Sequence, residues 1–141
     1  MVVRRWVEEM WNERRYSLCE ELIAAVFLEH AHAPFSEQEP GLVDGPATMR
    51  ATMEWLIGQF PDLQMRIEDL VAEGDVVAVR VVSTGTNLGP LNGVLPATGR
   101  RFTAEQSHWF RLENDRIVEH WATRDDLTAM LQLGALPRPS G

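Results

Sequence analysis

The sequence predicts an α+β fold, with helices in the first part of the chain and an antiparallel sheet in the second. Hydrophobic residues recur every three or four positions before Pro61 and at every second position after it. Short segments rich in glycine, asparagine and aspartate divide the second part into four strands. Helices followed by a run of strands joined by short turns are typical of α+β domains.

The N-terminal part predicts two helices. Apolar residues at positions i, i+3, i+4 and i+7 form one stripe of a helix over residues 2–10. Ser17 and Glu20 have the spacing of a capping box, which predicts a second helix over about 18–26. We expect the apolar side chains of both helices to face a common core.

A loop and a third helix complete the part before the sheet. Residues 28–44 show no period and contain two histidines and two prolines, so we expect a loop over the surface or over a pocket mouth. Pro46 suits the first turn of a helix, where its missing N–H costs nothing, and Pro61 ends that helix.

The period-two part contains four strands and a final short helix. We expect the strands over residues 63–73, 76–86, 102–112 and 116–123, and the helix over 127–133. Because short turns join successive strands, the sheet should be antiparallel.

Composition and charge exclude several functions. The chain has 141 residues and a formal net charge of −8, whereas binding nucleic acid or an anionic membrane surface needs a basic face. All 13 basic residues are arginine, so no lysine Schiff base can form and pyridoxal phosphate chemistry is excluded. Five tryptophans and five phenylalanines favour an apolar or aromatic small molecule as the ligand.

Cysteine usage and hydropathy indicate a single cytoplasmic domain. Cys19 is the only cysteine, so no intramolecular disulfide is possible. The N-terminus lacks the apolar stretch of a signal peptide, and no segment has the roughly 18 apolar residues that span a bilayer. We expect one domain over residues 1–136 and a flexible tail over 137–141.

The strand over 102–112 carries the most informative pattern. Its apolar face has polar residues in the middle, at Gln106 and His108. A purely structural strand rarely buries such groups, because buried polar atoms need partners. A ligand pocket against this face explains both residues.

The strand over 116–123 can be placed beside it. If Leu112 and Val118 both face inward, positions that sum to 230 lie opposite each other. The facing pairs are then Phe110 with His120, His108 with Ala122, and Gln106 with Arg124. The inward faces of these strands supply no carboxylate.

Other interpretations of the histidines remain open. His108 and His120 could be core or rim residues whose hydrogen bonds are satisfied, and His30 and His32 could pack in the loop or line a pocket mouth. We expect no metal, because the four histidines lack the spacing of three or four converging ligands.

Several segments resemble the SnoaL-like polyketide cyclases, also described as SnoaL-like ester cyclases. They are GTNLGPLNGVLPATGRRFTAEQSHWFRLENDRIVEHWATRDD at 85–126, MLQLG at 130–134, EEMWNE at 8–13, GPATMRA at 45–51 and FPDLQMRIEDLVAEGDVVAVR at 60–80. The resemblance implies a cone-shaped barrel of a curved antiparallel sheet wrapped by N-terminal helices. It also implies ring closure of an anthracycline precursor methyl ester by an intramolecular aldol reaction, without metal or cofactor.

The family's functional residues can be carried over only in part. Gln106 and His108 match the polar segment of the family, and His120 matches the histidine near the end of the fourth strand. The catalytic aspartate of the family lies two residues after that histidine, where this chain has Ala122. Alanine cannot transfer a proton, so another group must do so if the reaction is retained.

These observations lead to two hypotheses. In the first, the protein is an enzyme that acts on an aromatic polyketide-type molecule, by aldol cyclisation or a related step such as hydroxylation. In the second, it binds such a molecule without chemistry. The expected catalytic residues are His108, His120 and Arg124, and the expected substrate-binding residues are Gln106, Phe110, His30, His32, Ala122 and Trp55.

We also expect a homodimer. The outward row of the strand over 102–112 carries Trp109 and Arg111, and these residue types are enriched in protein interfaces.

Overall fold

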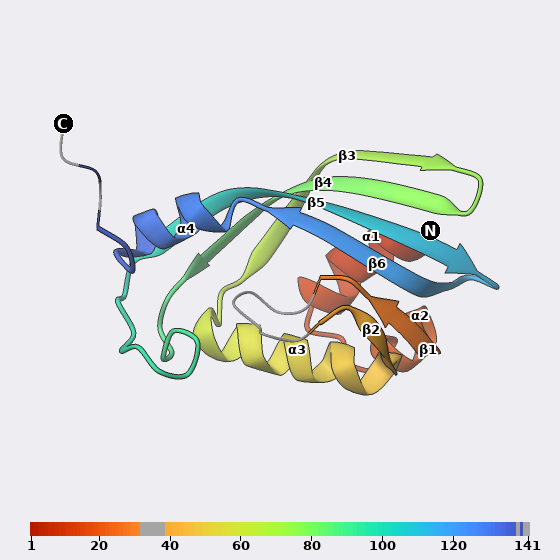
Figure 1. Cartoon of the computed structure of the whole chain (residues 1–141), viewed down its shortest axis with the longest axis horizontal. Coiled ribbons are helices and arrows are strands. Elements are labelled where there is room, and N and C mark those ends of the chain that lie inside the picture. The colour runs from red at the N-terminus through yellow and green to blue at the C-terminus, as the bar shows by residue number, and fades with distance from the viewer. Residues whose placement is uncertain (32–38, 138, 140–141) are drawn as a thin grey trace.

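The computed structural model describes residues 1–31, 39–137 and 139, and it is organised around one curved six-stranded sheet (Figure 1). The strands lie in the order β2 (Gly41–Asp44), β1 (Ile23–Glu29), β6 (Arg116–Arg124), β5 (Arg101–Glu113), β4 (Val76–Thr86) and β3 (Gln64–Glu73). All neighbours are antiparallel except β1 and β6, which are parallel. The α+β class is confirmed, but the sheet is open, with β2 and β3 as its edges.

The four predicted strands are confirmed as β3 to β6, because alternation and turn residues act together. Gly74, with a φ of +59°, turns the chain between β3 and β4. Asn114 and Asp115 both have positive φ, at 52° and 60°, between β5 and β6. Two successive positive φ values match the twist of the flanking strands in a tight hairpin.

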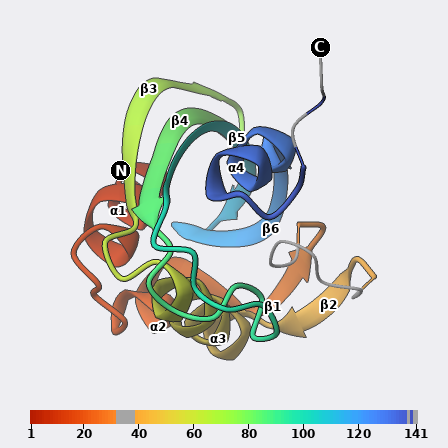
Figure 2. The same ribbon diagram turned by 90° about the vertical axis from the view of Figure 1, so that its left-hand side faces the viewer.

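The helices cover the concave side of the sheet (Figure 2). They are α1 (Val2–Arg5), which continues as the π-helical segment η1 (Trp6–Trp11), then α2 (Leu18–Leu22), α3 (Gly45–Gln59) and α4 (Asp126–Leu133). The predicted helices at 2–10, after Asp44 and at 127–133 are confirmed. No helix in the described ranges combines the length and apolar character needed to cross a membrane.

The helix expected over 18–26 and the loop expected over 28–44 are wrong in part. The helix ends at Leu22, and Ser17 forms no side-chain cap. Residues 23–29 instead form β1, which pairs with β2 and with β6. The run IAAVFLE is apolar enough for either structure, and pairing with the free edge of β6 decides between them.

A single buried cluster fills the space between the sheet and the helices. Its fully buried members include Val3, Val7, Met10, Leu22, Ile23, Phe27, Met53, Leu91, Phe110, Ile117 and Leu133. They come from both ends of the chain and from every layer, so the helices and the sheet depend on one another for stability.

Candidate active site

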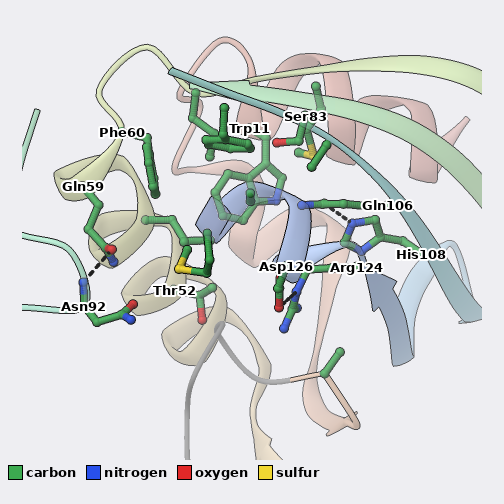
Figure 3. A pocket seen from close by; sticks show the side chains of 18 of the residues that line it. Trp11, Thr52, Gln59, Phe60, Ser83, Asn92, Gln106, His108, Arg124 and Asp126 are labelled. Carbon is green, nitrogen blue, oxygen red and sulfur yellow. Dashed lines mark hydrogen bonds and ion pairs between the residues drawn. The ribbon is translucent and has the colours of Figure 1, made fainter. Parts of the chain in front are cut away.

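A cavity lies on the concave side of the sheet, walled by α3, α4 and η1 (Figure 3). Most of its lining is apolar: Trp6, Trp11, Ala31, Met49, Leu56, Phe60, Leu63, Met65, Leu91, Phe102, Ala104, Ala129, Met130 and Leu133. Polar side chains gather where β5, β6 and β1 meet. An apolar cavity with a few grouped polar residues is the usual form of a small-molecule site.

The predicted pairing of β5 with β6 is confirmed along the wall of the cavity. Gln106 lies opposite Arg124, and His108 lies opposite Ala122. The register shifts by one residue near the hairpin, so that Leu112 pairs with Ile117 instead of Val118. This bulge lies outside the polar wall and leaves its geometry unchanged.

Four side chains on this wall form one chain of hydrogen bonds. Gln106 Oε1 lies 2.9 Å from His108 Nε2, and His108 Nδ1 lies 2.9 Å from His120 Nε2. His120 Nδ1 lies 2.8 Å from Glu29 Oε1. Both histidines and the glutamate are at most 5% exposed. Each imidazole therefore has both ring nitrogens engaged.

Glu29 was missed by the sequence analysis, which expected no carboxylate in the pocket. That expectation is wrong, because Glu29 and Asp126 both line the cavity. The predicted loop over 28–44 includes residue 29, whereas Glu29 ends β1 on the same buried face as Phe27. Phe27 and Glu29 are two positions apart, so in a strand they lie on the same face. This spacing is the sequence signal that would place Glu29 in the pocket.

Burial and charge set the protonation of His108. Its pKa lies well below the usual value, first because burial disfavours the charged imidazole, and then because electrostatic interactions with His120 and Arg124 oppose a second positive charge there. The Trp6 indole covers both imidazoles, with ring centroids 5.2 Å from His108 and 5.8 Å from His120. His108 is therefore a neutral imidazole in the folded protein at neutral pH.

The lowered pKa of His108 predicts that the protein loses stability as the pH falls below about 6.5. In that range an unfolded histidine takes up a proton and folded His108 does not, so protonation favours unfolding. Urea denaturation between about pH 7 and pH 5 measures this, and His108→Gln should show a flatter dependence. Equal slopes in the two proteins would contradict the assignment.

Arg124 and Asp126 extend the polar wall towards α4. Arg124 Nε lies 3.4 Å from Asp126 Oδ2, and both residues line the cavity. Figure 3 shows this pair beside His108 and Gln106. The guanidinium therefore lies where an oxygen of a ligand near His108 could accept a hydrogen bond.

The structure separates some expected binding residues from the cavity. Phe110 is fully buried against Trp6, and Ala122 lies opposite His108 without being part of the lining. Trp55 is also absent from the lining, although its α3 neighbours Thr52, Leu56 and Gln59 belong to it.

His30 and His32, both expected to bind substrate, can be compared with the structure only in the case of His30. His30 lies on the other face of the sheet, where it stacks on Trp121 with centroids 4.8 Å apart and lies 2.7 Å from Glu119. The hydrogen bond from His30 is the main cause of the lowered pKa of the Glu119 carboxyl. His32 lies outside the described residues.

A loop between β4 and β5 closes one side of the cavity. The Asn92 backbone N–H donates to Gln59 Oε1 over 2.8 Å, which ties the loop to α3 (Figure 3). Gly89 lies so close to α3 that a Cβ there would be 1.9 Å from the Gly58 carbonyl oxygen. This contact requires glycine and holds Leu91 and Asn92 in the cavity wall.

Within residues 1–31, 39–137 and 139, no three or more His, Cys, Asp or Glu side chains are grouped so as to hold a metal ion. The histidine pair and Glu29 are joined to one another instead. Their arrangement is therefore suited to proton transfer.

The fold and the site define a small α+β protein with a hydrogen-bonded histidine pair and a carboxylate in the wall of an apolar cavity. The sequence profile of the SnoaL-like polyketide cyclases matches residues 1–133. The chain belongs to this family, as the resemblance in the sequence indicated.

Three relatives illustrate the family. The chain is 32% identical to the aklanonic acid methyl ester cyclase of Streptomyces peucetius, over 99% of this chain and 94% of that protein. It is 32% identical to the nogalonic acid methyl ester cyclase of Streptomyces nogalater, over 68% of this chain and 72% of that protein. IdmH of Streptomyces antibioticus, which has been proposed to be a polyketide cyclase, superimposes with a TM-score of 0.79 at 32% identity, over 94% and 96% of the two chains.

Proposed function

We propose that the protein closes a ring of an aromatic polyketide-type methyl ester by an intramolecular aldol reaction, with His108 as the general base. The observation that carries this proposal is the buried imidazole of His108 in the wall of an apolar cavity, hydrogen-bonded to Gln106 and His120. Burial lowers the pKa of His108, which keeps the imidazole neutral. A base of this kind can take a proton from a carbon next to a carbonyl at neutral pH. The names of the two curated relatives support a methyl ester as the substrate.

The reaction needs two proton transfers in opposite directions, after which His108 has the same protonation state as before. His108 removes a proton from the carbon next to a ketone or ester carbonyl, which gives an enolate. That carbon attacks a second carbonyl of the same molecule, a C–C bond forms, and the new alkoxide takes the proton back from the imidazolium. Gln106 and Arg124 lie beside His108 and can donate hydrogen bonds to the enolate oxygen. We propose that no metal or cofactor is required.

Incubation with nogalonic acid methyl ester and with aklanonic acid methyl ester tests the proposal. The expected product has the mass of the substrate, a new ring and a shifted absorption spectrum, and it forms equally well with a metal chelator present. Saturable binding without any product would contradict the enzymatic proposal and support a binding protein instead. Substrate kept without protein measures the spontaneous reaction.

We further propose a cytoplasmic homodimer that forms through the outer face of the sheet. Trp109 is 48% exposed on that face, and Arg111 lies beside it within 5.9 Å of the Trp121 ring. Cys19 is a buried free thiol, which fits a reducing compartment. Sedimentation at micromolar concentration tests the assembly, and a monomer throughout would contradict it.

A further inference from the structure

Glu29 has no role in the scheme above, yet it ends the hydrogen-bonded chain that begins at Gln106. Its Oε1 accepts from the backbone N–H of Ala31 over 2.9 Å and lies 2.8 Å from His120 Nδ1. The side chains of Glu29 and His120 are only 7% and 6% exposed. A buried carboxylate joined to a histidine pair is costly unless it balances a charge.

Hydrogen-bond rules permit two proton arrangements along this chain. A carboxylate only accepts, so His120 must donate from Nδ1 to Glu29. If His120 also carries a proton on Nε2, it donates to His108 Nδ1, and His108 donates from Nε2 to Gln106 Oε1. If His120 Nε2 lacks a proton, it accepts from His108 Nδ1, and His108 Nε2 has a free lone pair that the Gln106 amide group can face after rotation.

The two arrangements differ by one proton and have opposite chemistry at His108 Nε2. With the extra proton, Nε2–H is an acid that can protonate an alkoxide. Without it, Nε2 is a base that can take a proton from carbon. An aldol reaction needs the base first and the acid second, at the same site.

We propose that Glu29 is a positioning residue that lets the His108–His120 pair store one proton and alternate between these two forms. The inference rests on the proposed function for its chemical use, although the proton itself is a property of the free protein. When His108 takes a proton at Nε2, its Nδ1 proton passes to His120, so the positive charge ends beside Glu29.

The surroundings show why a carboxylate is required for this storage. Trp6 packs against both imidazoles from η1, and both histidines are at most 5% exposed. Arg124 on β6 adds a second positive charge near His108, while Asp126 on α4 pairs with Arg124. Glu29 on β1 is thus the carboxylate in contact with the histidine pair, and without it a stored proton would be an uncompensated buried charge.

Glu29 also explains how Ala122 can be tolerated. Ala122 lies opposite His108 and offers no group that could exchange a proton. The negative charge reaches the histidines instead from β1, which lies on the far side of β6 from β5. The carboxylate acts through His120, so it need not touch the substrate.

Nitrogen-15 NMR of the histidine rings tests the stored proton without any substrate. At about pH 7 the wild-type protein is expected to hold both imidazoles neutral, which leaves His108 Nε2 free to act as the base. As the pH falls, the first imidazole protonated on both nitrogens is expected to be His120. In Glu29→Gln the amide oxygen can still accept both hydrogen bonds, but the charge is lost, so this protonation should need a lower pH. Protonation of His108 before His120 in the wild-type protein would overturn the proposal even if Glu29→Gln failed to fold.

Kinetics give the second measurement. Glu29→Gln is expected to lower kcat by about 10²–10⁴-fold with little change in KM. Glu119→Gln is the matched control, because Glu119 also contacts a histidine but on the outer face, and it should retain wild-type kcat. Unchanged kcat and NMR spectra in Glu29→Gln would overturn the inference. Lack of turnover by the wild-type protein would contradict the proposed function alone, since the NMR result would stand.

Discussion

Replacement of His108 by alanine is expected to lower kcat by about 10²–10⁴-fold, which is the usual contribution of a positioned general base. The imidazole is the member of the hydrogen-bonded chain whose Nε2 adjoins both Gln106 and the cavity. Ring closure of nogalonic acid methyl ester, followed at several substrate concentrations, separates the effect on kcat from that on KM.

The control for this substitution is Ser107→Ala, the preceding residue on β5 and on its other face. It should leave both kinetic constants unchanged. His108→Ala also leaves His120 Nε2 without its partner, at a cost of about 1–3 kcal/mol in stability. The assays should therefore be run well below the unfolding midpoint of each variant. Full turnover by folded His108→Ala would show that another group is the base.

The pairing of β5 with β6 could be predicted because local features determine it. Alternation assigns each residue to a face, and a short turn fixes which residues lie opposite each other. Three facing pairs followed from this argument, and Gln106 with Arg124 is one of them. The bulge at Leu112 could not be predicted, since nothing in the hairpin sequence specifies an extra residue.

Glu29 could not be predicted because its position depends on a distant pairing. β1 is held by β6, and Glu29 meets His120 across 91 positions in sequence. The run before Glu29 is apolar and contains two alanines, so its sequence alone does not distinguish helix from strand. Tertiary contacts decided the structure, and with it the carboxylate of the site.

The same error accounts for the expected position of His30. In a loop, neighbouring side chains such as Glu29 and His30 could both line a pocket mouth. At the end of a strand they point to opposite faces. Glu29 therefore reaches His120 inside the sheet, whereas His30 reaches Glu119 outside it.

Replacement of Phe110 by alanine is expected to destabilise the fold by about 3–5 kcal/mol. The sequence analysis placed this ring in the substrate site, which predicts a higher KM and an unchanged stability. The structure places it beneath the site, fully buried, with ring centroids 4.9 Å from Trp6 and 5.0 Å from His120. Urea denaturation of Phe110→Ala distinguishes the two roles.

Val71→Ala is the comparison for Phe110→Ala, because Val71 is an apolar strand residue that is 64% exposed. It should change the stability by less than about 1 kcal/mol. Phe110 also stacks on the ring of His120, whose two nitrogens form hydrogen bonds with His108 and Glu29. Loss of the Phe110 ring should therefore loosen the histidine pair and lower kcat in the fraction of the protein that stays folded. A stable Phe110→Ala with only a raised KM would instead return Phe110 to the substrate site. The experiment thus decides whether the acid–base pair is held by the core or by the ligand.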